Sequence, residues 1–267
     1  MNILPAPTKL QHLRDQLATL APRGPGEACA SFVLGETRAD RAAGPLIRTG
    51  LHEVYAASGP HAASANGFTL SLALRAALPP LVWIYDEQAL HEAGGPYGSG
   101  LQEWGLDPAD LLLVRVRKAQ ALLAAGEEAL KSGAAGAVLM SGWGESAAYG
   151  LTASRRLALA AQAGASTALL VRSDAEPGPS AADTRWSVAA APSVALEAKA
   201  PGRPAFRAAL LRSRNGSAGG EWIMEWDRES LSFVEPAAPG GVVSVPADRP
   251  AARRAGGAPR RAAGGGR

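Results

Sequence analysis

Cysteine is nearly absent from this chain, because Cys29 is the only one among 267 residues. One cysteine excludes an intrachain disulfide framework and a multi-cysteine metal site, and it favours a reducing compartment. Long apolar runs are missing as well. No stretch of about eighteen apolar residues occurs, and residues 1–7 hold two prolines and no apolar block. We therefore expect a soluble, cytoplasmic protein without a membrane partner.

Lysine is missing from the whole interval between Lys9 and Lys118, and the net charge of +3 is unevenly distributed. Proline, glycine, alanine and arginine dominate residues 236–267, a composition that cannot bury enough surface to fold alone. We predict that this segment is a disordered tail. Its arginines fit either an acidic protein surface or DNA phosphates. These candidate interaction residues are Arg249, Arg253, Arg254, Arg260, Arg261 and Arg267.

Leucines recur at helical spacing near the N-terminus. Leu10, Leu13, Leu17 and Leu20 share one face of a predicted amphipathic helix over residues 8–20. Prolines and glycines in residues 21–26 then indicate a linker. Residues 1–26 therefore form a separate N-terminal segment, whose helix either packs on its own domain or docks on a neighbouring protein.

The segment from Leu51 to Ser141 alternates strands and helices in the order of a nucleotide-binding α/β core. We predict a strand at 51–56, a loop at 57–68, a helix at 69–78 and a continuous apolar strand at 81–85, as in parallel sheets buried on both faces. Residues 91–105 read as a loop or short helix. Later strands are expected at 111–116, 137–140 and 167–171, and helices at 118–132 and 151–163. The fold class is α/β, with a mostly parallel sheet flanked by helices.

From Thr184 the pattern changes to strands without long helices between them. Turn residues separate strand-like pieces at 184–189, 193–198, 206–212, 221–226 and 231–234. We expect antiparallel strands added at one sheet edge, completing a core domain over residues 27–235. Trp222 and Trp226 have the same parity and share one face. Such a pair either packs in the core or stacks bases.

The loop after the first core strand lacks the chemistry of a phosphate loop. That loop uses glycines to turn backbone N–H groups towards phosphates, a lysine to neutralise them, and a Ser or Thr hydroxyl on Mg²⁺. Here Gly59 supplies a glycine, and Asn66 and Gly67 stand where the glycine and lysine should enter the helix. Thr69 alone retains a hydroxyl. By itself, the loop is better explained as an ordinary strand–helix connection.

Two acids follow the apolar strand at 81–85. Acids at the carboxyl end of such a strand lie where ligands bind in open α/β sheets. Glu87 is a candidate base for activating water, or else a solvated strand end. The strand at 137–140 is followed by Ser141 and Gly142, whereas an ATPase of this architecture places an aspartate there for the Mg²⁺ shell.

Several phrases resemble the RecA superfamily, and more closely the ImuA group of damage-inducible, RecA-like mutagenesis proteins. Tyr85-Asp86-Glu87-Gln88-Ala89-Leu90 is similar to the RecA phrase that carries the catalytic glutamate, and Glu127-Glu128-Ala129-Leu130 resembles a helix further on. The phrases closest to the ImuA group are Gly100-Leu101-Gln102-Glu103-Trp104-Gly105-Leu106-Asp107-Pro108, Arg155-Arg156-Leu157-Ala158-Leu159-Ala160-Ala161, Thr184-Arg185-Trp186 and Leu211-Arg212-Ser213-Arg214-Asn215-Gly216. The resemblance covers roughly residues 30–235.

The resemblance implies a RecA-like P-loop NTPase-type core with degenerate Walker motifs. The lysine position holds Gly67, the neighbouring Ser/Thr position holds Phe68, and the strand-end aspartate position holds Ser141. Glu87 is then a vestigial catalytic residue, and no cofactor is expected. The implied function is a non-catalytic accessory role in SOS-induced, error-prone translesion DNA synthesis. The implied partners are RecA, the polymerase-like protein ImuB and an error-prone replicative-type polymerase, with DNA contacted indirectly.

Two alternatives remain open at this point. In the first, the chain is an ATPase with an unusual phosphate loop, in which Arg155 or an arginine of a neighbouring subunit replaces the lysine. In the second, it binds DNA directly through the arginine-rich tail. Nucleotide titration and deletion of residues 247–267 distinguish these alternatives from the accessory role.

Overall fold

The computed structural model of the protein describes residues 31–35, 37–76, 79–194, 200, 202–216 and 219–236. The predictions for Leu10, Leu13 and Leu17, and for the arginines of the tail, lie outside these residues. No helix in the described ranges is long and apolar enough to cross a membrane.

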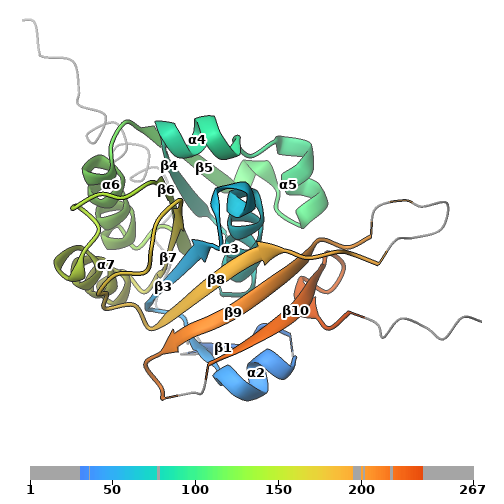
Figure 1. Cartoon of the computed structure of the whole chain (residues 1–267). Coiled ribbons are helices and arrows are strands. Elements are labelled where there is room, and N and C mark those ends of the chain that lie inside the picture. Colours follow the sequence, from blue (N-terminus) through green and yellow to red (C-terminus); the bar gives the residue numbers. More distant parts are fainter. Residues whose placement is uncertain are drawn as a thin grey trace, which may run out of the picture. The chain divides into compact units, whose positions relative to one another are not determined.

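A large mixed sheet organises the described residues, with the strand order β11-β10-β9-β8-β3-β7-β6-β4-β5 (Figure 1). The six strands from β8 to β5 in this order run parallel to one another. Their bounds are β3 (Leu51–Ala56), β4 (Leu81–Asp86), β5 (Leu111–Val116), β6 (Ala137–Trp143), β7 (Thr167–Ser173) and β8 (Thr184–Ala190). The sheet thus has the mostly parallel α/β character expected from the alternating pattern, and β3 lies inside it between β8 and β7.

Antiparallel strands extend the sheet beyond β8. Each of β9, β10 and β11 pairs antiparallel with the strand before it. Their bounds are β9 (Ala205–Ser213), β10 (Gly220–Asp227) and β11 (Ser232–Val234). The prediction of antiparallel strands added at one edge by the C-terminal part of the core is therefore confirmed.

Helices cover the two faces of the sheet and bury two separate apolar cores. On one face, α2, α3, α4 and α5 enclose a core that includes Phe68 of α3, Trp83 and Trp186. On the other face, α6 and α7 bury residues such as Leu122 and Leu157, and Figure 1 shows these two helices side by side, away from α3. The helix bounds are α2 (Arg38–Ala43), α3 (Ala62–Ala76), α4 (Glu87–Ala93), α5 (Gly98–Trp104), α6 (Ala119–Lys131) and α7 (Leu151–Ala163).

Smaller elements complete the fold. A two-stranded antiparallel sheet pairs β1 (Ser31–Phe32) with β2 (Leu46–Ile47). Two short 3₁₀ turns, η1 (Gly59–His61) and η2 (Pro108–Asp110), precede α3 and β5. Helix α2 begins with a capping box, in which Thr37 and Asp40 satisfy each other's backbone N–H groups.

The tryptophans of the edge strands are core residues. Trp226 is fully buried, with its ring centroid 5.3 Å from that of Phe233, and Trp222 lies 6.3 Å from the ring of Trp186. They share a face of β10 as their parity predicts. Because that face is the core face, the structure packs Trp226 inside the core and holds Trp222 half-buried against it.

Two predicted boundaries are wrong. The helix expected at 69–78 begins at Ala62, so the preceding loop is much shorter than predicted. The strand expected at 193–198 does not start at residues 193–194, which have no regular secondary structure, and residues 195–198 are outside the described ranges. Pro192 lies just before this stretch and has no N–H to give to a strand ladder.

Candidate functional site

The connection from β3 to α3 is the place where a phosphate loop would lie. It consists of residues 57–61 and is held close to the end of β8. The amide of Ala57 donates to the carbonyl of Val188 at 2.9 Å. The amide of Ala190 donates to Nδ1 of His61 at 3.2 Å. The connection is thus tied to its neighbouring strand by its own backbone and side-chain bonds.

Helix α3 begins directly after this short connection. Pro60 occupies the first turn of η1, and the next residues include Ala62, Ala63 and Ala65, which are strong helix formers. The asparagine and glycine at 66–67 resemble a loop signal, but here they lie inside the helix. Asn66 and Gly67 therefore do not lie in the loop predicted for them, and Thr69 lies in the helix interior and not at its start.

Gly67 and Thr69 are committed to packing within α3. The Thr69 side chain is fully buried, and its hydroxyl donates to the carbonyl of Ala65 at 2.7 Å. A Cβ atom placed on Gly67 would lie 3.1 Å from the indole ring of Trp104. The hydroxyl thus has its partner inside the helix, and the position of the missing lysine faces an aromatic ring.

Asn66 and Ser141 are brought together by the fold. The Ser141 hydroxyl donates to Oδ1 of Asn66 at 2.7 Å and accepts the indole N–H of Trp83 at 2.9 Å. Both strand-end serine and helix asparagine are neutral, so this pair offers no charge to a magnesium ion or a phosphate. Its evident effect is to join β4, β6 and α3 at the carboxyl end of the sheet.

Asp86 is the acid that sequence reasoning passed over. Its Oδ1 accepts the amide of Ala89 at 2.6 Å and so caps α4, and its Oδ2 accepts the amide of Trp143 at 3.1 Å. The Trp143 ring in turn lies next to Gly59, where a Cβ atom would be 3.6 Å away. An aspartate directly before a helix is a recognised N-cap signal. The contact with Trp143 joins distant parts of the sequence and has no local signal.

Glu87 is exposed and is the first residue of α4. Its carboxylate lies 3.7 Å from Arg117 Nε and 4.0 Å from Arg115 Nε, at the end of the neighbouring strand β5. These long, solvated pairs are worth little. The contacts of Glu87 therefore run towards β5, whereas those of Asn66 run towards β6.

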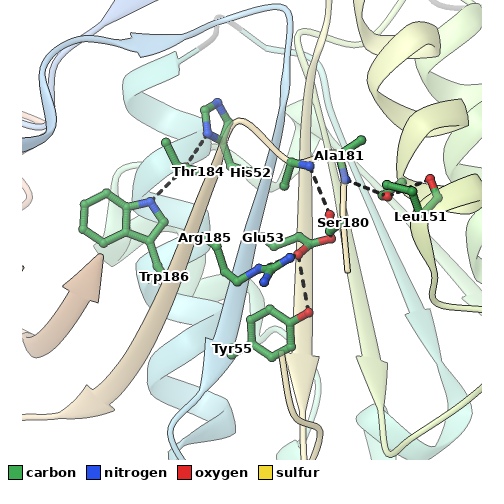
Figure 2. A network of polar contacts seen from close by, with 11 residues as sticks. His52, Glu53, Tyr55, Leu151, Ser180, Ala181, Thr184, Arg185 and Trp186 are labelled. Atoms are coloured by element: carbon green, nitrogen blue, oxygen red, sulfur yellow. Dashed lines mark hydrogen bonds and ion pairs between the residues drawn. The ribbon is translucent and has the colours of Figure 1, made fainter. Parts of the chain in front are cut away.

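A second polar cluster crosses the middle of the sheet on the α7 side (Figure 2). The carboxylate of buried Glu53 on β3 accepts three hydrogen bonds. They come from Nε of Arg185 at 3.2 Å, the Ser180 hydroxyl at 2.5 Å and the Tyr55 hydroxyl at 3.4 Å. Burial, followed by the Glu53 charge, raises the pKa of Tyr55 to about 12. The cluster joins β3, β8 and the loop between β7 and β8, and its members satisfy one another.

His52 occupies the opposite face of β3. Its Nε2 lies 2.7 Å from the carbonyl of Ile47, so that nitrogen carries the proton. Thr184 Oγ1 then donates to Nδ1 at 2.7 Å and accepts the indole N–H of Trp186 at 3.0 Å. Burial lowers the pKa of His52 and outweighs the carbonyl and Asp183, which act in the other direction. The ring is therefore neutral and structural.

Arg155 and Arg156 lie in the second turn of α7, on the sheet face opposite α3. Arg156 pairs with Glu127 of α6, which also binds Lys131. Burial alone would raise the pKa of Glu127, but these two cations lower it on balance. Glu127 is thus the partner of Arg156 within the described residues. The placement of α7 gives Arg155 no contact with the β3–α3 connection in the described structure.

No protein-family model and no curated protein matches this chain. Within the described residues, no group of three or more His, Cys, Asp and Glu side chains is placed to hold a metal ion. The chemistry of the β3–α3 region must therefore be argued from its own geometry.

Proposed function

We propose that this chain is a RecA-like accessory protein of error-prone translesion DNA synthesis that acts through protein contacts and does not turn over ATP. Its partners in this proposal are RecA, an ImuB-like protein and the associated error-prone polymerase. The absence of ATP turnover (the chemical part) and the choice of partners (the partner part) are supported by different observations.

The short, tied connection between β3 and α3 carries the first part. A phosphate loop presents free backbone N–H groups and a lysine to its ligand. Here the helix starts at Ala62, Gly67 faces the Trp104 ring, and the lysine is absent. Thr69 and Asp86, which have the chemistry to bind magnesium, already have partners inside the protein. These features favour a core that has the architecture of a nucleotide-binding protein without its phosphate site.

The second part is supported by the sequence phrases that resemble RecA and the ImuA group. The strand order is compatible with it, because a parallel α/β core followed by antiparallel strands at one edge is the arrangement those phrases imply. Strand β3 lies inside the sheet, and the strand that precedes Glu87, β4, lies three positions away from it, beyond β7 and β6.

Titration of the purified full chain with Mg-ATP and Mg-ADP tests the chemical part. We expect no saturable binding at millimolar nucleotide and no ATP turnover, with or without single-stranded DNA. If turnover is measured, Glu87→Gln and the matched variant Glu92→Gln, which changes another exposed acid of α4, separate catalysis from surface charge. Turnover that is lost in Glu87→Gln and kept in Glu92→Gln would refute the proposal.

Pull-down with purified RecA and an ImuB-like protein tests the partner part. The experiment is repeated with chains lacking residues 1–22 and residues 247–267, because the predicted amphipathic helix and arginine-rich tail are the proposed contact segments. We expect capture of at least one partner by the full chain and weaker capture by a truncated one. Absence of capture by the full chain would remove the assignment to translesion synthesis while leaving the chemical part intact.

A further inference from the structure

A groove opens between α3, the end of β4 and the segment that joins α4 to α5. It encloses about 210 Å³. One wall is formed by Trp83 and Tyr85, whose rings are stacked with centroids 5.0 Å apart, and another includes Trp104 of α5. An apolar cavity of about 150 Å³ holds a benzene molecule. This groove therefore has room for one aromatic ring of benzene to indole size.

Small residues keep the mouth of the groove open. Ala63 of α3 is exposed there, and the facing segment contributes Gly94, Gly95 and Gly100. A side chain at Gly94 would meet no atom within 4 Å, and one at Gly100 would approach only the Tyr97 ring, at 4.0 Å. Tyr97 is itself 74% exposed at this rim. Aromatic rings thus line the groove, with Trp83 and Tyr85 each 4% exposed and Trp104 half-buried, and the small residues at its mouth do not fill it.

Two polar side chains among the lining residues have unused hydrogen-bonding capacity. The Tyr85 hydroxyl is buried and has no hydrogen-bond partner, whereas buried polar atoms are normally satisfied. The Asn66 amide oxygen is bound by Ser141, which leaves its NH₂ group oriented by that bond and without a recorded acceptor among the described residues. An N–H group on a bound ring can donate to the Tyr85 hydroxyl oxygen, whereas the Asn66 NH₂ group needs an acceptor such as a carbonyl.

The charge of the groove indicates the kind of molecule that supplies the ring. None of its lining residues is charged, whereas sites for single-stranded nucleic acid combine aromatic rings with cations that follow the phosphates. The described residues include every tryptophan, tyrosine and phenylalanine of the chain. The segments outside the described residues therefore contain no aromatic side chain to offer.

We propose that this groove is an anchor site for one tryptophan side chain presented by a partner protein. Buried aromatic anchors in small pockets commonly dominate the energy of protein interfaces. The groove would hold the indole between the Trp83–Tyr85 pair and Trp104. This inference stands on the groove alone and does not depend on a role in translesion synthesis.

N-acetyltryptophanamide is the probe that tests this anchor site on the full chain. Binding is followed by the indole N–H signals of Trp83 and Trp104 in ¹H–¹⁵N spectra, assigned by Trp→Phe replacement. We expect a saturable shift of these two signals with a dissociation constant of about 0.1–1 mM, typical of a ligand of this size. N-acetylleucinamide, adenosine and an oligo-dT strand are titrated in parallel.

Two variants fill the groove from opposite walls. Ala63→Leu and Gly100→Leu place a side chain into open space at exposed positions, and each should weaken probe binding at least tenfold. Ala121→Leu makes the same change as the first on an exposed face of α6 and should bind as the native chain does. Two filling variants are used so that one remains informative if the other folds poorly.

Several outcomes would overturn the proposal. The first is that the Trp83 and Trp104 signals do not shift at up to 10 mM probe, about tenfold above the expected range. The second is that both filling variants bind the probe as tightly as the native chain does. The third is that N-acetylleucinamide binds as tightly as the tryptophan probe. Tighter binding of adenosine or oligo-dT than of the tryptophan probe would replace the protein anchor by a nucleobase site. Failure of RecA or ImuB-like capture bears on none of these outcomes.

Discussion

Replacement of Gly67 by lysine tests where the helix after β3 begins. In the phosphate-loop interpretation of the sequence, Gly67 stands at the position of the missing lysine, and Gly67→Lys would restore the cation. In the structure, Gly67 lies in the second turn of α3, and a Cβ atom there would be 3.1 Å from the Trp104 ring. The two interpretations therefore predict opposite effects of one substitution.

The magnitude follows from crowding and helix propensity. Forcing a side chain into a packed site costs about 1–3 kcal/mol, and replacing glycine inside a helix returns about 1 kcal/mol at most. Trp104 resists displacement because its indole N–H donates to Ser71 at 2.9 Å. We expect Gly67→Lys to lower the free energy of unfolding by about 1–2 kcal/mol, or the Tm by about 2–8 °C, without creating Mg-ATP binding.

Gly67→Ala is the matched control. It adds only the Cβ atom, whose close contact is with the far edge of the indole ring. The gain in helix propensity should offset this crowding, so the stability should stay within about 0.5 kcal/mol of the native value. Urea unfolding and calorimetric titration with Mg-ATP measure both quantities. Native stability of Gly67→Lys together with saturable nucleotide binding would refute the observed helix start and the argument built on it.

Three further predictions concern the buried polar groups. Burial lowers the pKa of His52 from its usual 6.5, so the unfolded chain binds a proton at this residue first as the pH falls. The free energy of unfolding should therefore drop by up to about 1.4 kcal/mol per pH unit below about pH 6.5, down to the folded-state pKa. In urea unfolding between pH 5 and 8, His52→Gln should flatten this slope. Glu53→Leu and Arg185→Met should each lower the free energy of unfolding by about 3–5 kcal/mol, because each leaves the other charge buried without its partner. The double variant should lose less than either single variant. Additive losses in the same assay would contradict a coupled pair. The Tyr85 hydroxyl is buried without a hydrogen-bond partner, and burial raises its pKa. Tyr85→Phe should therefore raise the free energy of unfolding by about 1 kcal/mol. A destabilised variant would show that the hydroxyl has a partner in solution.

Much of the sheet was predictable because the signals that define it are local. The run Leu81–Asp86 is buried along its whole length, as a continuous apolar strand predicts. The predicted bounds of β5 and α7 agree with Leu111–Val116 and Leu151–Ala163. The antiparallel strands at the edge were also predictable, because turn residues separate them and no long helix intervenes. In these segments, spacing and turn chemistry indicate the same structure.

The candidate site was harder to predict because its contacts join distant parts of the chain. The Asn-Gly sequence at 66–67 is a common turn signal, but packing against Trp104 and an alanine-rich first turn keep it helical. The bonds from Ser141 to Asn66 and from Trp143 to Asp86 connect residues far apart in sequence. A single sequence identifies such residues as polar, but it does not reveal which partner each one has.

We propose that polar groups which already have partners disfavour nucleotide binding, even if a cation comes from another subunit. Each Asp86 oxygen already accepts one amide, from Ala89 or from Trp143, and the Ser141 hydroxyl already donates to Asn66, so a magnesium ion would find only their remaining lone pairs. Bonds to a charged group are worth about 1.5–3 kcal/mol and neutral ones about 0.5–1.5 kcal/mol. A nucleotide pose that broke all three bonds would therefore cost about 3.5–7.5 kcal/mol, which corresponds to about a three-hundredfold to three-hundred-thousandfold loss of affinity. We propose that a cation supplied in trans would have to overcome this cost in any such pose, which is a reason against ATP turnover that is separate from the missing lysine.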